Sequence, residues 1–115
     1  MIMVIDDDAI MAECIARGCG PSDVLVFGDA ISAMAEISGG RIPDLIFLDV
    51  LLTGPDGFTF LNELVSYTDT AKIPIVIVTS LDLNDRDLSA YGVVGVLDKD
   101  TMRPEEICAY AKQYS

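Results

Sequence analysis

Histidine and tryptophan are absent from this 115-residue chain, and basic residues are scarce. Without histidine, the chain cannot form a Ser-His-Asp or Cys-His catalytic set or a histidine-ligated zinc site. Seven Lys and Arg residues stand against 19 Asp and Glu residues, which gives a formal net charge of -12. Such a surface repels the phosphate backbone of nucleic acids and attracts cations. The side-chain chemistry that remains in quantity is that of carboxylates and hydroxyls, and oxygen ligands are what Mg²⁺ prefers.

Long apolar runs and paired-cysteine motifs are also missing, and no secretory leader is expected. No run has the length of about 20 residues that spans a bilayer, and Met1 leads into an apolar stretch without a basic region or cleavage site. The three cysteines show no CxxC spacing and are predicted to be reduced thiols, with Cys14 and Cys108 packed on helices. With 51% hydrophobic residues, residues 1–115 are predicted to form one soluble, cytoplasmic domain that does not bind membranes.

Apolar, β-branched stretches recur at regular intervals along the chain. They are Met1–Ile5, Val24–Phe27, Leu45–Leu48, Ile73–Val78 and Val93–Leu97. Their apolar residues are nearly continuous, which is typical of strands buried on both faces. Helical spacing lies between them, as in the i,i+4 pairs Ile10/Cys14 and Met11/Ile15, and a short helix is predicted between Thr79 and Gly92. Five β-α units in succession predict an α/β fold, with a doubly wound five-stranded parallel sheet.

Chemically active side chains stand where the predicted strands end. The first strand is followed by Asp6 and Asp7, the third by Asp49 and the fifth by Lys99, while the fourth ends at Thr79. Each of these has an ordinary explanation, because Asp is common in turns and Lys on surfaces. Ligands of parallel sheets bind beyond the carboxyl ends of the strands. The agreement of four strand ends therefore predicts one site at that edge of the sheet.

Four segments of the chain follow a recognisable order: "VIDDD", "LIFLDVLLTGPDGFTFL", "IPIVIVTS" and "GVLDKD". With these segments the chain resembles the receiver domain of two-component response regulators, over essentially its whole length. The resemblance implies a flavodoxin-like (βα)5 fold with strand order 2-1-3-4-5. It also implies a signalling domain rather than an enzyme with a separate substrate, although such domains assist their own phosphorylation and dephosphorylation.

The same resemblance assigns a role to each site residue. Asp49 is expected to accept a phosphoryl group from a phosphohistidine, with Thr79 and Lys99 contacting the phosphoryl oxygens. A Mg²⁺ ion is expected on Asp6, Asp7, Asp49 and the main-chain carbonyl of Leu51. These roles agree with general chemistry, since carboxylates act as nucleophiles and phosphoryl transfer depends on positioning and charge neutralisation.

A chain without histidine cannot carry its own phosphohistidine, so a histidine kinase or a histidine phosphotransfer protein is the expected donor. Phosphorylation would then change contacts with a downstream effector, a C-terminal output domain or a second copy in a homodimer. In the family that the chain resembles, the residues two after the acceptor Asp and two after the Thr flank the path of the attacking water. Here they are the apolar Leu51 and Leu81, which predicts a long-lived phosphoryl group. Three positions depart from the family pattern: Val96 replaces an aromatic residue, Asp100 a proline and Thr53 a proline.

Other interpretations of the same residues remain. In a haloacid-dehalogenase-type phosphatase, Asp6 would be the nucleophile and Asp8 the acid/base, but that family needs an acidic pair well downstream of the Lys, and Asp100 lies too close to it. A pseudo-receiver would keep the fold without being phosphorylated; Val96 favours it slightly, but the complete set of acidic residues, Thr79 and Lys99 argues against it. A flavodoxin-like cofactor binder fits worst, because no phosphate-binding loop rich in Gly, Ser or Thr follows the first strand.

Overall fold

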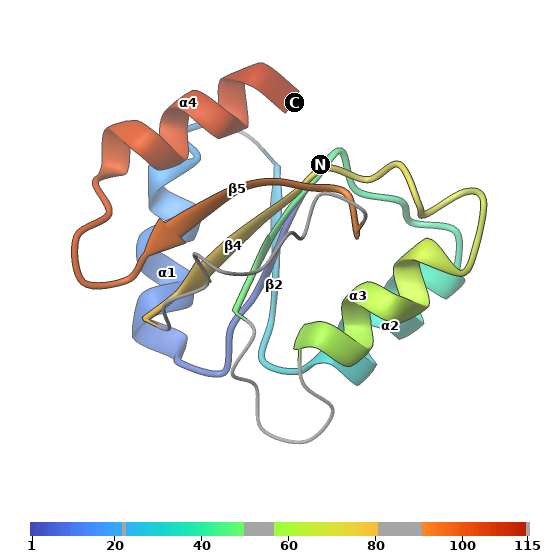
Figure 1. The fold of residues 1–115 in the computed structure, drawn as a ribbon. Helices are drawn as coiled ribbons and strands as arrows, with labels where there is room; N and C mark the ends of the chain where they lie inside the picture. The colour runs from blue at the N-terminus through green and yellow to red at the C-terminus, as the bar shows by residue number, and fades with distance from the viewer. Residues whose placement is uncertain (22, 50–56, 81–90, 115) are drawn as a thin grey trace.

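The computed structural model describes residues 1–21, 23–49, 57–80 and 91–114 (Figure 1). Strands and helices alternate along the chain. The elements are β1 (Ile2–Ile5), α1 (Ala9–Gly18), β2 (Val24–Phe27), α2 (Ala30–Ser38), β3 (Leu45–Leu48), α3 (Gly57–Val65), β4 (Ile75–Thr79), β5 (Val93–Asp98) and α4 (Pro104–Tyr114). The five predicted strands are confirmed, and β4 begins two residues later than expected and includes Thr79. The helix predicted between Thr79 and Gly92 falls on 81–90, which lie outside the described residues.

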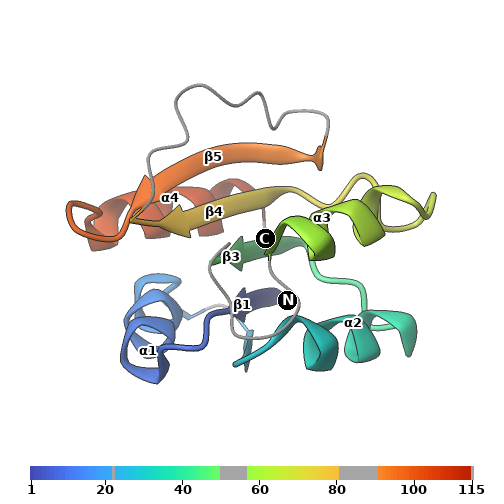
Figure 2. The same cartoon turned by 60° about the horizontal axis from the view of Figure 1, so that its bottom comes forward.

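All five strands pair in parallel in one sheet, in the order β2-β1-β3-β4-β5. This confirms the predicted doubly wound, flavodoxin-like topology. Ile5 lies opposite both Phe27 and Leu48, so the carboxyl ends of β1, β2 and β3 are level. In Figure 2 the arrowheads of β1, β3 and β4 point to the same side of the molecule. Residues that follow these strands are therefore brought to one edge.

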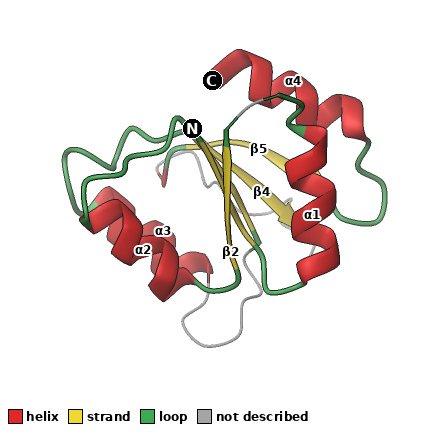
Figure 3. Cartoon of the chain, turned by 180° about the vertical axis from the view of Figure 1, so that it is seen from behind, coloured by secondary structure: helices red, strands yellow, loops and turns green. Residues whose placement is uncertain are grey.

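The central strands β1, β3 and β4 are buried on both faces because two layers of helices cover the sheet, whereas the edge strands β2 and β5 are partly exposed. Figures 1 and 3 show α1 and α4 on one side of the sheet and α2 and α3 on the other. Alternate strand residues face opposite layers: Met3, Ile46 and Ile75 pack with α2 and α3. Val4, Phe47 and Val76 pack with α1 and α4. This two-sided burial explains why the sequences of β1, β3 and β4 are continuously apolar rather than alternating. The prediction of two-sided burial is wrong for β2 and β5, because an edge strand has a neighbour on one side only and keeps part of its surface in contact with solvent.

Helix α1 packs only a narrow apolar face against the sheet. Ala12 and Ile15 are buried, whereas Ile10 is 77% exposed and Cys14 is also exposed. The prediction that Cys14 is packed is therefore wrong, because Ile10 and Cys14 lie on the side of the helix that faces solvent. The close approach of α1 to α4 needs a glycine, since a Cβ on Gly18 would stand 2.9 Å from Ile107 Cγ2. Among the helices in the described ranges, none has both the length and the apolar character needed to cross a membrane.

Candidate functional site

The four predicted strand ends meet at the carboxyl edge of the sheet. Asp6 and Asp49 directly follow the neighbouring strands β1 and β3, and the Asp49 N–H donates to the Ile5 carbonyl oxygen over 2.9 Å. Thr79 is the last residue of β4, and its carbonyl oxygen accepts a hydrogen bond of 3.1 Å from the Lys99 N–H. Asp6, Asp49 and Lys99 directly follow strands of the sheet and Thr79 ends one, so the sheet fixes their positions.

The carboxylates of Asp6, Asp7 and Asp49 form the acidic side of this edge. One carboxylate oxygen from each lies within 4.8 Å of the others. Asp6 is 2% exposed and Asp49 is 4% exposed, whereas Asp7 faces solvent. Two of the three charges are thus held in the protein interior, where an unneutralised carboxylate is costly.

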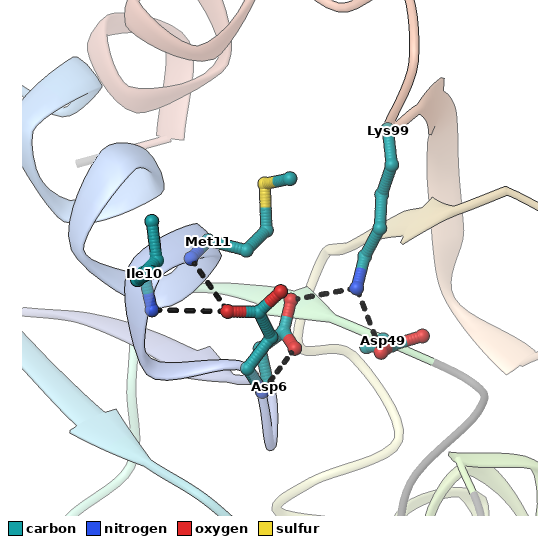
Figure 4. Close-up of polar contacts among 6 residues, drawn as sticks. Asp6, Ile10, Met11, Asp49 and Lys99 are labelled. Carbon is teal, nitrogen blue, oxygen red and sulfur yellow. Dashed lines mark hydrogen bonds and ion pairs between the residues drawn. The ribbon is translucent and has the colours of Figure 1, made fainter.

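Lys99 supplies the opposite charge. Its Nζ donates to Asp49 Oδ2 over 2.9 Å and lies 3.0 Å from Asp6 Oδ2, so one ammonium group bridges the two buried carboxylates (Figure 4). Burial acts to lower the pKa of Lys99, but the hydrogen bond to Asp49 and the attraction of the Asp49 and Asp6 carboxylates outweigh that effect and raise the pKa. Lys99 is therefore charged at neutral pH.

Asp6 has two oxygens in different surroundings. Oδ1 accepts a hydrogen bond of 2.9 Å from the Asp8 N–H, while Oδ2 is buried beside the Lys99 ammonium. No directed hydrogen bond reaches Oδ2 from the described part of the chain, so its contact with Lys99 is an ion pair only. Burial raises the pKa of Asp6, and the Asp8 N–H and Lys99 offset only part of this effect.

This set of oxygens fits a divalent cation. Asp6 Oδ2 is a buried oxygen without a directed hydrogen bond, and the carboxylates of Asp7 and Asp49 lie within reach of the same ion. Hard cations such as Mg²⁺ take carboxylate and carbonyl oxygens and keep several waters, which suits a site with one solvent-facing carboxylate. The expected carbonyl ligand, Leu51, lies outside the described residues, as do Leu81 and Thr53.

The family of the chain follows from its sequence as a whole. The profile of the response regulator receiver domain matches residues 2–112. The chain belongs to this family. Receivers are signalling domains of two-component systems, and phosphorylation and Mg²⁺ binding are general features of the family.

Relatives of this receiver are longer proteins. It is 32% identical over 106 residues to protein-glutamate methylesterase/protein-glutamine glutaminase 2 of Chromobacterium violaceum, covering 85% of the chain but 29% of the relative. Over 54 residues it is 46% identical to the response regulator PleD of Caulobacter vibrioides, covering 47% of the chain and 12% of PleD. The chain thus spans less than a third of either relative.

The fold agrees with solved receivers. The crystal structure of the NtrX receiver domain from Brucella abortus superimposes with a TM-score of 0.83, covering 99% of this chain and 97% of that one at 24% identity. At this identity the likeness shows the fold alone. It nevertheless extends over nearly all of both chains.

Two features of the receiver site were not predicted from the sequence. Asp8 caps α1 and also contacts Asp6 through its backbone. Asp98 supports the turn that carries Lys99, because its side chain accepts from the Asp100 N–H over 2.8 Å and its carbonyl from the Met102 N–H over 2.8 Å. An Asp directly before a helical pattern is a sequence signal for the first of these. No comparable pattern in the sequence predicts the turn after Asp98.

The structure describes Val96, which stands where the family pattern has an aromatic residue. Val96 lies in β5 and is 48% exposed, and in the register of the sheet it pairs with Ile77. A valine there has no ring that could move between solvent and the interior. The receiver therefore lacks, at this position, the aromatic side chain that the resemblance led us to expect.

Proposed function

We propose that residues 1–115 form a single phosphoacceptor receiver domain in which Asp49 takes a phosphoryl group from a partner's phosphohistidine. The supporting observation is the position of Lys99, whose ammonium lies 2.9 Å from Asp49 Oδ2 and 3.0 Å from Asp6 Oδ2. A positive group held there can neutralise charge on the transferred phosphoryl oxygens, which is the main requirement of such a reaction. Thr79, buried at the end of the neighbouring strand, would donate its hydroxyl to a phosphoryl oxygen.

The transfer forms one bond and breaks another. A carboxylate oxygen of Asp49 bonds to phosphorus as the P–N bond of the donor breaks, and the bonding electrons leave with the imidazole nitrogen. Asp6, Asp7, Asp49 and the main-chain carbonyl of Leu51 would hold Mg²⁺, which when bound supplies further positive charge for the phosphoryl oxygens. The sheet edge positions Asp49, and Lys99 stabilises the acyl phosphate that results.

The partners follow from the same chemistry. Because the chain contains no histidine, a histidine kinase or a histidine phosphotransfer protein must bring the phosphohistidine, and we place this exchange in the cytoplasm. The output would be a changed contact with an effector, with a C-terminal output domain or with a second copy. A net charge of -12 argues that this domain alone does not bind nucleic acid.

Among the alternatives, the pseudo-receiver draws support from Val96, since the residue that usually reports phosphorylation is replaced. The phosphatase interpretation would need Asp6 as a nucleophile. Asp6 instead lies 2% exposed with Oδ1 bonded to the Asp8 N–H and Oδ2 beside Lys99, which is the arrangement of a fixed ligand rather than of an attacking group.

Intact-mass spectrometry tests the proposal. The protein is incubated with a phosphorylated histidine phosphotransfer domain, or with a small acyl phosphate, in the presence and absence of Mg²⁺. We expect one phosphoryl group per chain that requires Mg²⁺, is absent in Asp49→Asn and is retained in Asp69→Asn, which changes an exposed carboxylate far along the chain. A wild-type protein that stays unmodified with every donor would favour the pseudo-receiver instead.

A further inference from the structure

Asp8 links the first helix to the acidic site. Its Oδ1 accepts hydrogen bonds from the N–H groups of Ile10, at 3.0 Å, and Met11, at 3.2 Å, so it is the N-cap of α1. Its own N–H donates to Asp6 Oδ1 over 2.9 Å. Figure 4 marks the hydrogen bonds of the Ile10 and Met11 N–H groups close to the bridge that Lys99 makes between Asp6 and Asp49. One residue thus ties the start of α1 to one oxygen of a buried carboxylate.

The hydrogen bond from Asp8 decides how the Asp6 carboxylate is turned. With Oδ1 engaged by the Asp8 N–H, Oδ2 is left beside the Lys99 ammonium, which also contacts Asp49 Oδ2, and the Asp6 carboxylate stands in one cluster with those of Asp7 and Asp49. The direction of that N–H depends on the extended backbone of Asp8, with φ -87° and ψ 105°. The two side-chain bonds to the first turn of α1 hold the backbone in that conformation.

We propose that Asp8 is a positioning residue for Asp6: its N-cap contact fixes the backbone N–H that orients the Asp6 carboxylate toward the cation site. This inference rests on the proposed function insofar as it concerns Mg²⁺, but the orientation itself exists without the metal. Asp8 is exposed and is not one of the proposed Mg²⁺ ligands. Mutation of a group that orients a metal ligand commonly weakens metal binding by about 10–100-fold.

The chain offers a matched control for the loss of a cap. Asp29 is the N-cap of α2, where its side chain accepts from the Ser32 N–H over 2.6 Å. Asp29→Ala removes one carboxylate and one helix cap, as Asp8→Ala does, but breaks no contact with Asp6. Asp8→Asn removes the charge and keeps an oxygen that can cap the helix, since Asn and Asp are equally good N-caps.

The test measures Mg²⁺ affinity by NMR titration of the wild type and the three variants. We expect Asp8→Ala to bind Mg²⁺ about tenfold more weakly than Asp8→Asn, and Asp29→Ala to bind like the wild type. Urea unfolding should show that both alanine variants lose stability, so the difference in affinity is not a general effect of a lost cap. Equal affinity in Asp8→Ala and Asp8→Asn, or an equal loss in Asp29→Ala, would overturn the proposal.

A second readout needs no metal. In the metal-free protein, the carboxyl ¹³C resonance of Asp6 and the Nζ resonance of Lys99 should shift in Asp8→Ala and stay near their wild-type positions in Asp8→Asn. Unchanged resonances in Asp8→Ala would refute the positioning role. If the wild type bound no Mg²⁺ but the resonances behaved as expected, the proposed function would fail while the positioning of Asp6 by Asp8 would stand.

Discussion

Replacing Lys99 by methionine should destabilise the metal-free protein and at the same time strengthen Mg²⁺ binding. Methionine keeps much of the length of the side chain but has no charge. The ammonium lies 2.9 Å from Asp49 Oδ2 and 3.0 Å from Asp6 Oδ2, and these carboxylates belong to residues that are 4% and 2% exposed. Without Lys99 they would repel each other in the interior with no cation between them.

The size of the effect follows from the burial of the three groups. Removing one partner of a fully buried ion pair costs about 3–5 kcal/mol. The Lys99 side chain is 16% exposed, so solvent screens part of the interaction and we expect a loss of about 2–3 kcal/mol in the free energy of unfolding. Binding of Mg²⁺ should be about tenfold tighter, because the ammonium no longer competes for Asp6 and Asp49, and this is worth about 1.4 kcal/mol.

Urea unfolding at pH 8, with and without Mg²⁺, measures both effects. At about 100 times its Kd, Mg²⁺ adds about 2.7 kcal/mol to the wild type, and the tighter binding should give Lys99→Met about 1.4 kcal/mol more. The stability gap between the two proteins should therefore shrink to about 1 kcal/mol. Lys72→Met, at an exposed position, is the control and should change neither quantity. A Lys99→Met protein as stable as the wild type without Mg²⁺, or one that binds Mg²⁺ more weakly, would refute the bridging role.

Three further predictions concern single side chains. Asp7→Asn should weaken Mg²⁺ binding, because it removes one charge and one coordinating oxygen; unchanged affinity in an NMR titration would exclude Asp7 as a ligand. Thr79→Ala should still be phosphorylated but should lose most of the change in partner binding, and a wild-type response to phosphorylation would contradict the role of its hydroxyl. Burial raises the pKa of Cys19 to about 11, so at pH 8 its thiol should stay protonated and react slowly with an alkylating reagent, while exposed Cys14 reacts first; mass mapping that found Cys19 modified before Cys14 would be inconsistent with the packing of α1.

Much of the fold could be predicted because its signals are local. Each strand is a short apolar run rich in β-branched residues, so its sequence alone indicates its conformation, and for the central strands β1, β3 and β4 it also indicates burial between two helical layers. The site could be located for a similar reason. Parallel strands bring their carboxyl ends to one edge, so Asp6, Asp49 and Lys99 could be grouped without knowing any distance.

Other features depend on side-chain directions that a sequence does not reveal. The pattern Ile10/Cys14 has the same helical spacing as Met11/Ile15, and only the packing of α1 on the sheet shows that the first pair faces solvent. In the same way, Lys99 was expected near the phosphoryl group, but its bridge between Asp49 and Asp6 depends on the turn that Asp98 supports. The roles assigned to the site residues remain predictions.

The position of the phosphoryl group tests the central claim most directly. After phosphorylation by an acyl phosphate with Mg²⁺, the aspartyl phosphate is reduced with borohydride and the modified residue is identified by peptide mapping. Asp49 should carry the modification, Asp49→Ala should abolish it, and Asp6→Ala should only reduce it, because Asp6 acts through the cation and Lys99. Modification of Asp6, with Asp49→Ala still labelled, would contradict the receiver mechanism and support a phosphatase that uses Asp6 as its nucleophile.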